Sequence, residues 1–463
     1  MTLKQAIEKH SGLSYVVNQL KIHSPMGRKA LLETKFSKDA VCLKSQFEII
    51  SACQRYISTN ANKKQLGKVF SILECIHDIS GTIKLLENNN TLDDISLFEI
   101  KSFSISVSNI KSLLFDLDIK ELIIPDLDSV ISILDPEKLQ LNQFYIYSAY
   151  SKELVKKRKQ WEESKGNNNE DLVNKLFLEC VALEDEIREE LSTKLRSQTM
   201  ILYDAINTIS KIDINFAKAI YFFNKRFSEP TINNSDTISY TKLVYPLLYD
   251  KFLENYRTFQ PIDISFSLAP TLITGANMAG KTLLLKSISL AQFLAQFAFF
   301  LPCENAEICL VENVLISIGD NQNEEEGLSS YASEILLLND FIQKAKQGKK
   351  YLILIDELAR TTNPTEGVAI VDSYLKIISK TNSFSITTTH YSGIKTPCKR
   401  LRVKGFINKE NKKMISIKDI QGHIDYSLIE EKEEKVPNEA LNIASLLNID
   451  KELIEEAKKL IKK

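Results

Sequence analysis

Cysteine is sparse in this sequence of 463 residues: the seven cysteines are scattered, form no CxxC pair and accompany no histidine cluster. This pattern predicts reduced, mostly buried thiols, and it argues against a zinc site or a disulfide framework. An excess of one charge is also lacking, because 59 basic residues stand against 60 acidic ones. Any binding to nucleic acid or to a membrane must therefore come from local patches.

Long apolar runs are missing as well. The N-terminal stretch MTLKQAIEKHSG carries charges where a signal peptide needs an apolar core. The most apolar stretch, residues 283–301, contains Lys286, Gln292 and Gln296, so a buried helix explains it better than a membrane span. We therefore expect a cytoplasmic protein with no membrane partner.

Glycine and proline are rare in the first half of the chain, where apolar residues recur every three or four positions. This periodicity predicts helices through residues 1–225. The longest pattern, residues 172–222, predicts one long helix, which would extend about 70 Å if unbroken. A helix at 151–165 and the turn sequence GNNNED (166–171) precede it, which predicts an antiparallel helical hairpin, about 137–225, that projects as an arm. Two ordinary helices of a bundle are the alternative.

Beyond residue 226 the pattern changes to short β-rich runs separated by helical segments. The runs are LITG (272–275), AEICLVENVLISIG (306–319), YLILIDE (351–357) and SFSITTTH (383–390). Such alternation is typical of a parallel sheet covered by helices. We therefore predict a multidomain α and α/β protein with a helical core at 1–225, an α/β domain at 226–425 and a C-terminal helical segment at 426–463.

One segment fits a phosphate-binding pattern. Residues 275–282 read G-x-x-x-x-G-K-[ST] and lie between a predicted strand and a predicted helix. The glycines let backbone N–H groups converge on phosphate oxygens, Lys281 would reach the β and γ phosphates, and Thr282 would bind Mg²⁺. The candidate nucleotide contacts are Gly275, Ala276, Asn277, Met278, Ala279, Gly280, Lys281 and Thr282.

Acidic residues close the apolar strand YLILIDE, and a histidine closes SITTTH. Asp356 would hold Mg²⁺ through water, and Glu357 would orient or deprotonate the attacking water. His390 would sense the γ-phosphate. Each feature alone is common at strand ends, but beside the phosphate loop they predict an ATPase or GTPase with Lys281, Glu357 and His390 as its catalytic residues.

Together these motifs resemble those of the MutS-type ATPases. TGANMAGKT (274–282) resembles the TGPNMxGK[ST] loop of that family, with Ala276 in place of proline, and TTTHY (387–391) resembles its histidine loop. The resemblance implies a P-loop ATPase domain of the MutS type, with ATP and Mg²⁺ as ligands.

The loop after the acidic strand is also similar to that of the family, in LILIDELARTTNPTEG (352–367). Arg360 and Thr362 fall on residues that communicate across the family's dimer. Ala359 and Thr361 stand where the family more often has glycine.

GLSSYASE (327–334) resembles the family signature G-x-S-T-F-x-x-E. The resemblance implies that Ser329 and Ser330 contact the ATP of the partner subunit, that Tyr331 packs and that Glu334 caps or braces. Glycine followed by two serines and a helical run is also an ordinary capped helix start.

Three other segments carry the resemblance further. LKIHSPMGRKALL (20–32) resembles the opening of the family's helical core, QPIDISF (260–266) the segment before the nucleotide loop, and ALNIASLLNIDKELIEEAKKLI (440–461) the dimerising tail. The resemblance therefore implies a homodimer with ATP sites built from both subunits. Tyr256 and Phe259 are the two candidates for stacking on adenine.

Mismatch-finding members of the family carry a Phe-x-Glu wedge domain and a connector ahead of the helical core. This sequence starts at the core, and its literal match, Phe227-Ser-Glu229, lies just before the ATPase segment. We therefore expect a short form without those domains, in which mismatch recognition is doubtful. GNNNED is also too short to hold the clamp domain found at the arm's tip.

Two functions stay open. In the first, the dimer clamps DNA in a repair-related role, and a basic cluster beside Trp161 neutralises phosphates; a solvated helix face is the alternative. This cluster comprises Lys152, Lys156, Lys157, Arg158 and Lys159. In the second, the arms grip a protein client. Some short relatives act in this way with a second subunit to reactivate cobalamin-dependent amino-acid aminomutases.

Overall fold

The computed structural model describes residues 1–141, 143–165, 170–275, 280–318, 330–360, 362–406, 424–431 and 450–461. The chain divides into two compact units. One unit is helical and comprises Leu20–Thr34 and Glu48–Tyr221; the other contains two sheets and comprises Met1–Gln19, Lys35–Phe47 and Phe222–Lys463. The expected combination of an all-helical region and a mixed α/β region is confirmed.

The helical unit is built from amphipathic helices of the predicted periodicity. In chain order they are α3 (Pro25–Glu33), the part of α4 (Ala40–Tyr56) from Glu48 onward, α5 (Asn60–Cys75), α6 (Ser80–Glu87), α7 (Asp94–Leu113), α8 (Asp128–Leu134), α9 (Lys152–Ser164), α10 (Glu170–Arg196) and α11 (Thr199–Lys225) as far as Tyr221, with 3₁₀ turns at Lys120–Leu122 and Ser148–Tyr150. The buried carboxylate of Asp213 accepts hydrogen bonds from the backbone N–H (2.7 Å) and the hydroxyl (2.6 Å) of Ser24, the N-cap of α3. A Cβ at Gly27 would lie 2.6 Å from that carboxylate, so glycine permits this contact.

The expectation of one unbroken helix over 172–222 is wrong. The chain forms α10 and α11, separated by a turn at Ser197 and Gln198. The Ser197 hydroxyl donates to the Lys194 carbonyl at 2.8 Å, and the Thr199 hydroxyl donates to the Arg196 carbonyl at 3.2 Å. Hydroxyl side chains compete in this way for carbonyls that a continuing helix would use.

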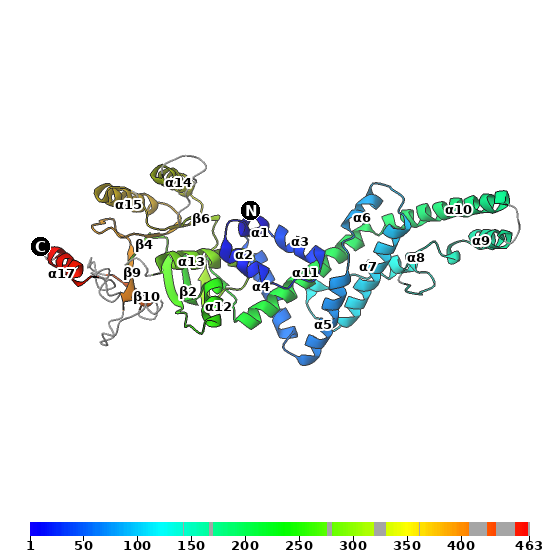
Figure 1. Ribbon diagram of the computed structural model, residues 1–463, viewed down its shortest axis with the longest axis horizontal. Helices are drawn as coiled ribbons and strands as arrows, with labels where there is room; N and C mark the ends of the chain where they lie inside the picture. The colour runs from blue at the N-terminus through cyan, green and yellow to red at the C-terminus, as the bar shows by residue number, and fades with distance from the viewer. Residues whose placement is uncertain are drawn as a thin grey trace. The chain divides into compact units, whose positions relative to one another are not determined.

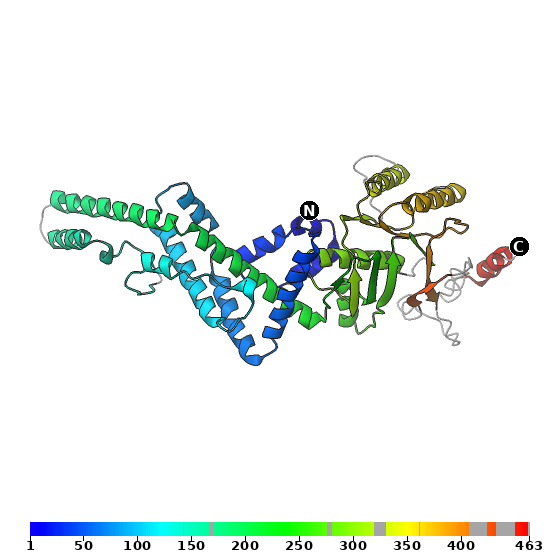
Figure 2. The same cartoon turned by 180° about the vertical axis from the view of Figure 1, so that it is seen from behind.

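Helix α9 lies antiparallel to the first part of α10, as Figures 1 and 2 show. Arg158 of α9 contacts Glu184 of α10, and Trp161, further along α9, contacts Phe177, which comes earlier in α10. The helical hairpin therefore closes through side-chain pairs as well as through the intervening chain.

The second unit holds a six-stranded sheet of order β10-β9-β4-β8-β7-β6, parallel except for the β9–β10 pair. Its strands are β4 (Thr271–Thr274), β6 (Asn313–Ser317), β7 (Tyr351–Ile355), β8 (Phe384–Thr388), β9 (Lys399–Phe406) and β10 (Ile424–Glu430). Every residue of β7 and β8 is buried. Helix α13 (Lys281–Gln296) covers one face, and α14 (Ser330–Ala345) and α15 (Pro364–Ile378) cover the other (Figure 1).

A smaller sheet of order β1-β5-β2-β3 completes this unit. It consists of β1 (Thr231–Ile232), β2 (Thr237–Leu243), β3 (Ile262–Ser267) and β5 (Asn305–Ile308), with α12 (Pro246–Glu254) between β2 and β3; α17 (Lys451–Ile461) follows β10 along the chain. The β-rich run predicted at 306–319 supplies β5 to one sheet and β6 to the other.

Two glutamine side chains of α13 explain this division. The Gln292 side chain donates to the Cys309 carbonyl at 3.0 Å. The Gln296 side chain donates to the Val311 carbonyl at 2.9 Å and accepts from the Val311 N–H at 3.2 Å. The backbone between β5 and β6 is thus satisfied by a helix and does not need a neighbouring strand.

The N-terminal helices α1 (Leu3–Ile7) and α2 (Ser11–Asn18) belong to the unit with the sheets. The His10 ring packs on Phe293 of α13, with centroids 4.3 Å apart. The Tyr15 hydroxyl donates to Asp250 of α12 at 2.7 Å, and Lys225 donates to the same carboxylate at 2.8 Å. The compact units therefore do not follow the boundary expected at residue 225, and the three proposed domains stay a prediction.

The composition led to predictions about the cysteines and about membrane-spanning helices. Cys53, Cys180, Cys303 and Cys309 are buried, and all seven cysteines are free. Within the described ranges, none of the helices is both long enough and apolar enough to cross a membrane.

Candidate nucleotide site

The carboxyl ends of β4, β7 and β8 meet at one edge of the larger sheet because these strands are parallel. Gly275 follows β4 directly, and Gly280 caps α13 with a left-handed φ of 75°. A Cβ at Gly280 would lie 2.9 Å from Cδ1 of Tyr426. Glycine is therefore required there both by the backbone and by the ring above it. The predicted contacts Ala276, Asn277, Met278 and Ala279 lie outside the described residues.

Lys281, the first residue of α13, is only 5% exposed. Its Nζ donates to the Gly275 carbonyl at 2.5 Å and so spans the two ends of the loop. An ammonium group at the N-terminus of a helix is the arrangement that phosphate-binding loops use for their lysine.

The next residue joins this loop to the acidic strand. The Thr282 hydroxyl donates to Oδ2 of Asp356 at 2.5 Å. The Thr388 hydroxyl, at the end of β8, donates to Oδ1 of Asp356 at 2.7 Å and accepts from the Glu357 N–H at 2.8 Å. Hydroxyl and carboxylate oxygens are the ligands that Mg²⁺ prefers, so Thr282 and Asp356 fit the ion predicted for them.

Glu357 faces the other two predicted functional side chains. Its Oε1 lies 3.5 Å from Nδ1 of His390, and its Oε2 lies 3.5 Å from Nη1 of Arg360. Glu357 itself has a positive φ of 54°, which is rare for a residue with a side chain. The structure therefore brings Glu357 and His390 together, with the glutamate held on a strained turn of the kind that clusters at functional sites.

The turn after β7 is held from two sides at Ala359. The Ala359 N–H donates to Oε1 of Glu334, on α14, at 2.6 Å, and its carbonyl accepts from the Tyr391 hydroxyl at 2.7 Å. Ala359 has a φ of 62°, a conformation that glycine adopts more readily. Glu334, for which the resemblance implies a capping or bracing role, thus contacts the backbone of Ala359. One hydrogen-bond network connects the segments GLSSYASE, YLILIDE with its following turn, and TTTHY.

Gly367 of α15 lies against the Tyr391 ring, where a side chain would not fit. A Cβ at Gly367 would lie 2.5 Å from Cζ of Tyr391. We expect Gly367→Ala to lower the free energy of unfolding by about 1–3 kcal/mol, because the added methyl displaces the ring. Urea unfolding measures the change.

Gly67→Ala is the matched control. Gly67 also lies in a helix, α5, but a Cβ there meets nothing within 4 Å. This variant should be neutral or more stable, by up to about 1 kcal/mol, because alanine favours helix. Equal stability of the two variants would contradict the role assigned to Tyr391.

The remaining predicted residues are less well defined by the structure. Ser330 begins α14, while Ser329 lies outside the described residues. Tyr331, for which the resemblance implies packing, is 37% exposed. Tyr256 is fully exposed, whereas Phe259 packs edge-on against Phe252 with centroids 5.7 Å apart.

Sequence reasoning missed Tyr426 and Thr388. The Tyr426 N–H donates to Oε1 of Gln260, and Nε2 of Gln260 donates to Oδ1 of Asp425 at 2.8 Å. The segment QPIDISF thus meets β10, and burial raises the pKa of the Tyr426 hydroxyl. The only signal in the sequence for Thr388 was its place at the end of an apolar strand.

The basic cluster of α9 is partly neutralised by α10 of the helical unit. Lys157 pairs with Glu179 at 2.5 Å, and Arg158 pairs with Glu184 at 2.7 Å. The hydrogen bond that Lys157 donates to the Glu179 carboxylate raises the pKa of Lys157. The Trp161 ring packs on Phe177, with centroids 5.5 Å apart. Lys152, Lys156 and Lys159 are exposed.

The residues of this site lie in a segment that matches a known family model. Residues 271–463 match the family model described as MutS domain V. Three curated relatives are named Endonuclease MutS2. The protein of Caldanaerobacter subterraneus subsp. tengcongensis is 32% identical over 253 residues, covering 50% of this chain and 31% of the relative. The proteins of Caldicellulosiruptor bescii and Pediococcus pentosaceus are each 32% identical, covering 46% of this chain and 26% of the relative. The aligned part is thus less than a third of each relative.

Proposed function

We propose that this protein is a dimeric, ATP-driven clamp that acts on DNA. The proposal is supported by the match of residues 271–463 to the MutS domain V family model and by the similarity of about half of the chain to proteins named Endonuclease MutS2. The observation that carries the ATPase proposal is the continuous network from Thr282 through Asp356 and Thr388 to the backbone of Glu357. This network connects Thr282, next to the predicted phosphate-binding loop, to Glu357, the proposed general base.

Each residue has a proposed task in hydrolysis. Lys281 and the N-terminus of α13 hold the phosphates. Thr282 and Asp356 would hold Mg²⁺, which when bound would neutralise negative charge on the phosphate oxygens. Glu357 orients the attacking water and accepts its proton. His390, 3.5 Å from Glu357, contacts the γ-phosphate and reports its presence to the turn that carries Glu357 and Arg360.

The dimer proposal has two supports. By sequence, Ser329 and Ser330 match the motif residues that the family presents to the partner's ATP, so each site would need both subunits. Helix α17, within the dimerisation segment proposed at 426–463, exposes Leu453 (63%) and Leu460 (72%) while burying Ile454. Exposed leucines on an amphipathic helix are suited to a partner surface.

DNA is the proposed client because the curated relatives are named endonucleases. The exposed residues Lys152 and Lys156 would contact phosphates without reading sequence. Mismatch recognition is not part of the proposal. Reading a base requires side chains that reach base edges, whereas the contacts proposed for Lys152 and Lys156 are to phosphates.

We expect duplex DNA to stimulate ATP turnover, with an affinity that falls steeply as salt rises. Lys152→Gln combined with Lys156→Gln should lower the slope of log affinity against log salt by about 2, roughly one for each lost phosphate contact. Fluorescence anisotropy with a labelled duplex at several salt concentrations measures this slope. Lys63→Gln combined with Lys64→Gln, two exposed lysines of α5, is the matched control.

A second candidate function rests on the pairing of Lys157 and Arg158 with α10 and on the packing of Trp161. Because Lys157, Arg158 and Trp161 already contact α10, they are less available to bind nucleic acid. If saturating DNA leaves turnover flat and the lysine replacements change nothing, the DNA proposal fails. The client would then be a protein, remodelled with a second subunit, as in reactivation of a cobalamin-dependent aminomutase.

A further inference from the structure

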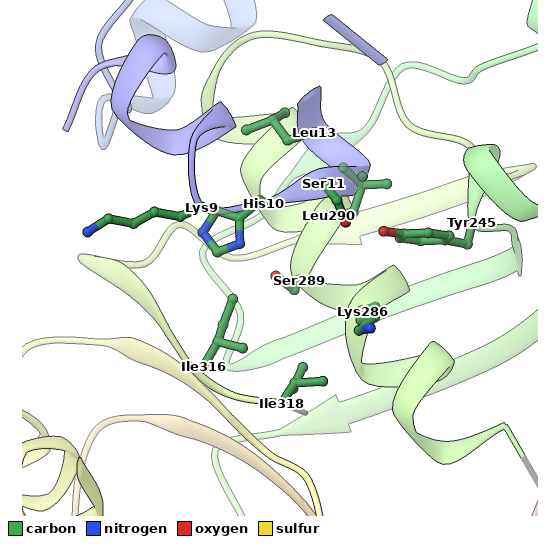
Figure 3. Close-up of a pocket in the computed structure, with 11 residues that line it drawn as sticks. Lys9, His10, Ser11, Leu13, Tyr245, Lys286, Ser289, Leu290, Ile316 and Ile318 are labelled. Carbon is green, nitrogen blue, oxygen red and sulfur yellow. The ribbon is translucent and has the colours of Figure 1, made fainter. Parts of the chain in front are cut away.

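A cavity of about 440 Å³ lies in the unit with the sheets, between the start of α2, helix α13 and the end of β6. Figure 3 shows its lining. Small-molecule sites in proteins typically have volumes of about 300–1,000 Å³. None of the residues assigned above to nucleotide binding or hydrolysis lines this cavity.

The first polar wall is the N-terminus of α2. The N-cap residue, His10, makes no side-chain hydrogen bond to the helix. Ser11, Gly12 and Leu13 line the cavity, and within the described ranges their N–H groups have no hydrogen-bond acceptor. Free N–H groups in the first turn of a helix carry partial positive charge and bind anions.

Ser289 of α13 provides an independent indication of a ligand. Its side chain lines the cavity and is only 5% exposed. Figure 3 shows its hydroxyl directed into the space between His10 and Ile316. Among the described residues this hydroxyl has no hydrogen-bond partner, although buried polar groups normally have one.

A second hydroxyl approaches the start of α2. A Cβ at Gly12 would lie 2.5 Å from the hydroxyl oxygen of Tyr245. Glycine at this position therefore lets the Tyr245 hydroxyl come close to the free N–H groups. The walls facing them are apolar and include Leu290, Ile316 and Ile318.

The charged side chains that line the cavity are positive. Lys9 and Lys286 line it and are exposed, and no described lining residue is acidic. Burial and the neighbouring Lys9 lower the pKa of His10 to about 4. His10 is therefore neutral near pH 7, and the two lysines and the helix N-terminus supply the positive charge.

We propose that this cavity is a second anion site, which binds a small phosphate-bearing molecule through the N-terminus of α2, Lys9, Lys286 and the hydroxyl of Ser289. Phosphate matches this donor set, because helix N–H groups and lysine ammonium groups are its common ligands. The apolar walls contact the remainder of the molecule.

The length of α13 separates this site from the nucleotide site. Thr282, Lys286 and Ser289 are spaced i, i+4, i+7 and therefore lie on one face of the helix. At a rise of 1.5 Å per residue, Ser289 lies about 10 Å along the helix axis from Thr282. The two sites thus lie at successive positions along one helix, and a ligand in the cavity contacts the helix whose first turn is assigned above to the nucleotide phosphates.

Calorimetric titration with pyrophosphate tests the proposal. The protein carries Lys281→Ala, so that the phosphate loop does not dominate the signal. We expect saturable binding that weakens at least ~10-fold when Lys9→Gln and Lys286→Gln are added, because two charge-assisted contacts are lost. Ser289→Ala should weaken it several-fold through loss of one hydrogen bond.

Lys4→Gln with Lys376→Gln, two exposed lysines away from the cavity, is the matched control and should leave the affinity unchanged. Acetate at equal ionic strength should not displace pyrophosphate. The proposal is overturned if no saturable binding occurs at millimolar pyrophosphate, or if the Lys9 and Lys286 replacements leave the affinity as it was. Because the nucleotide site is already disabled, either result leaves the ATPase proposal standing.

Discussion

Replacing Glu357 by glutamine is expected to lower the rate of ATP hydrolysis at least ~100-fold, the scale of a lost general base. Glutamine keeps the shape of the side chain but cannot accept the proton of the attacking water. The backbone contact from the Glu357 N–H to Thr388, at 2.8 Å, does not depend on the carboxylate. ATP binding should therefore persist, and the dimer should accumulate in its ATP-bound form.

Single-turnover hydrolysis and equilibrium binding of a fluorescent ATP analogue separate these two effects. Light scattering after size-exclusion chromatography measures the ATP-bound dimer. Glu307→Gln, an exposed glutamate on β5, is the control and should behave as the wild type. Unchanged turnover in Glu357→Gln would remove Glu357 from its assigned role, and a loss of ATP binding would indicate a structural role.

The parts of the site that follow from local backbone geometry could be predicted from the sequence. Gly280 and Lys281 belong to a sequence pattern whose spacing is typical of phosphate-binding loops. Asp356 follows an apolar run that can only be a buried strand beside such a loop. The parallel sheet then brings the ends of β4, β7 and β8 together without further information.

The parts that depend on contacts between distant segments could not be predicted. The clamp on Ala359 needs Glu334 from α14 and Tyr391 from the segment after β8. No spacing rule relates these positions, because their distance in space is set by how two helices and three strands pack. The ring of Tyr426 over Gly280 likewise depends on the pairing of β10 with β9.

Element boundaries failed where side chains replaced backbone partners. The β-rich run at 306–319 divides into two strands, because Gln292 and Gln296 satisfy the backbone at its middle and allow the chain to change sheets. The periodicity through 172–222 continues across Ser197, whose hydroxyl ends α10 by bonding to the Lys194 carbonyl. Apolar periodicity indicates which face of a helix or strand is buried. It does not indicate where a polar side chain will take the place of a backbone hydrogen-bond partner.

Replacing Lys281 by alanine is expected to weaken ATP binding at least ~100-fold, because charge-assisted contacts to two phosphates are lost. Lys281 is 5% exposed and its Nζ already lies 2.5 Å from the Gly275 carbonyl, so its ammonium is positioned at the loop. Turnover should fall to background. Lys376→Ala, an exposed lysine of α15, is the control. Retention of both binding and turnover in Lys281→Ala would end the nucleotide proposal.

The same variant tests whether each ATP site needs two subunits. A Ser329→Ala, Ser330→Ala protein should also be inactive alone if these serines serve the partner's nucleotide. In an equal mixture about half of the dimers contain one subunit of each kind, and such a dimer has one site with both an intact Lys281 and intact serines from the partner. Turnover should therefore recover to about a quarter of the wild-type rate at equal total protein. No recovery at any mixing ratio would contradict the composite site, because it would mean that lysine and serines act within one subunit.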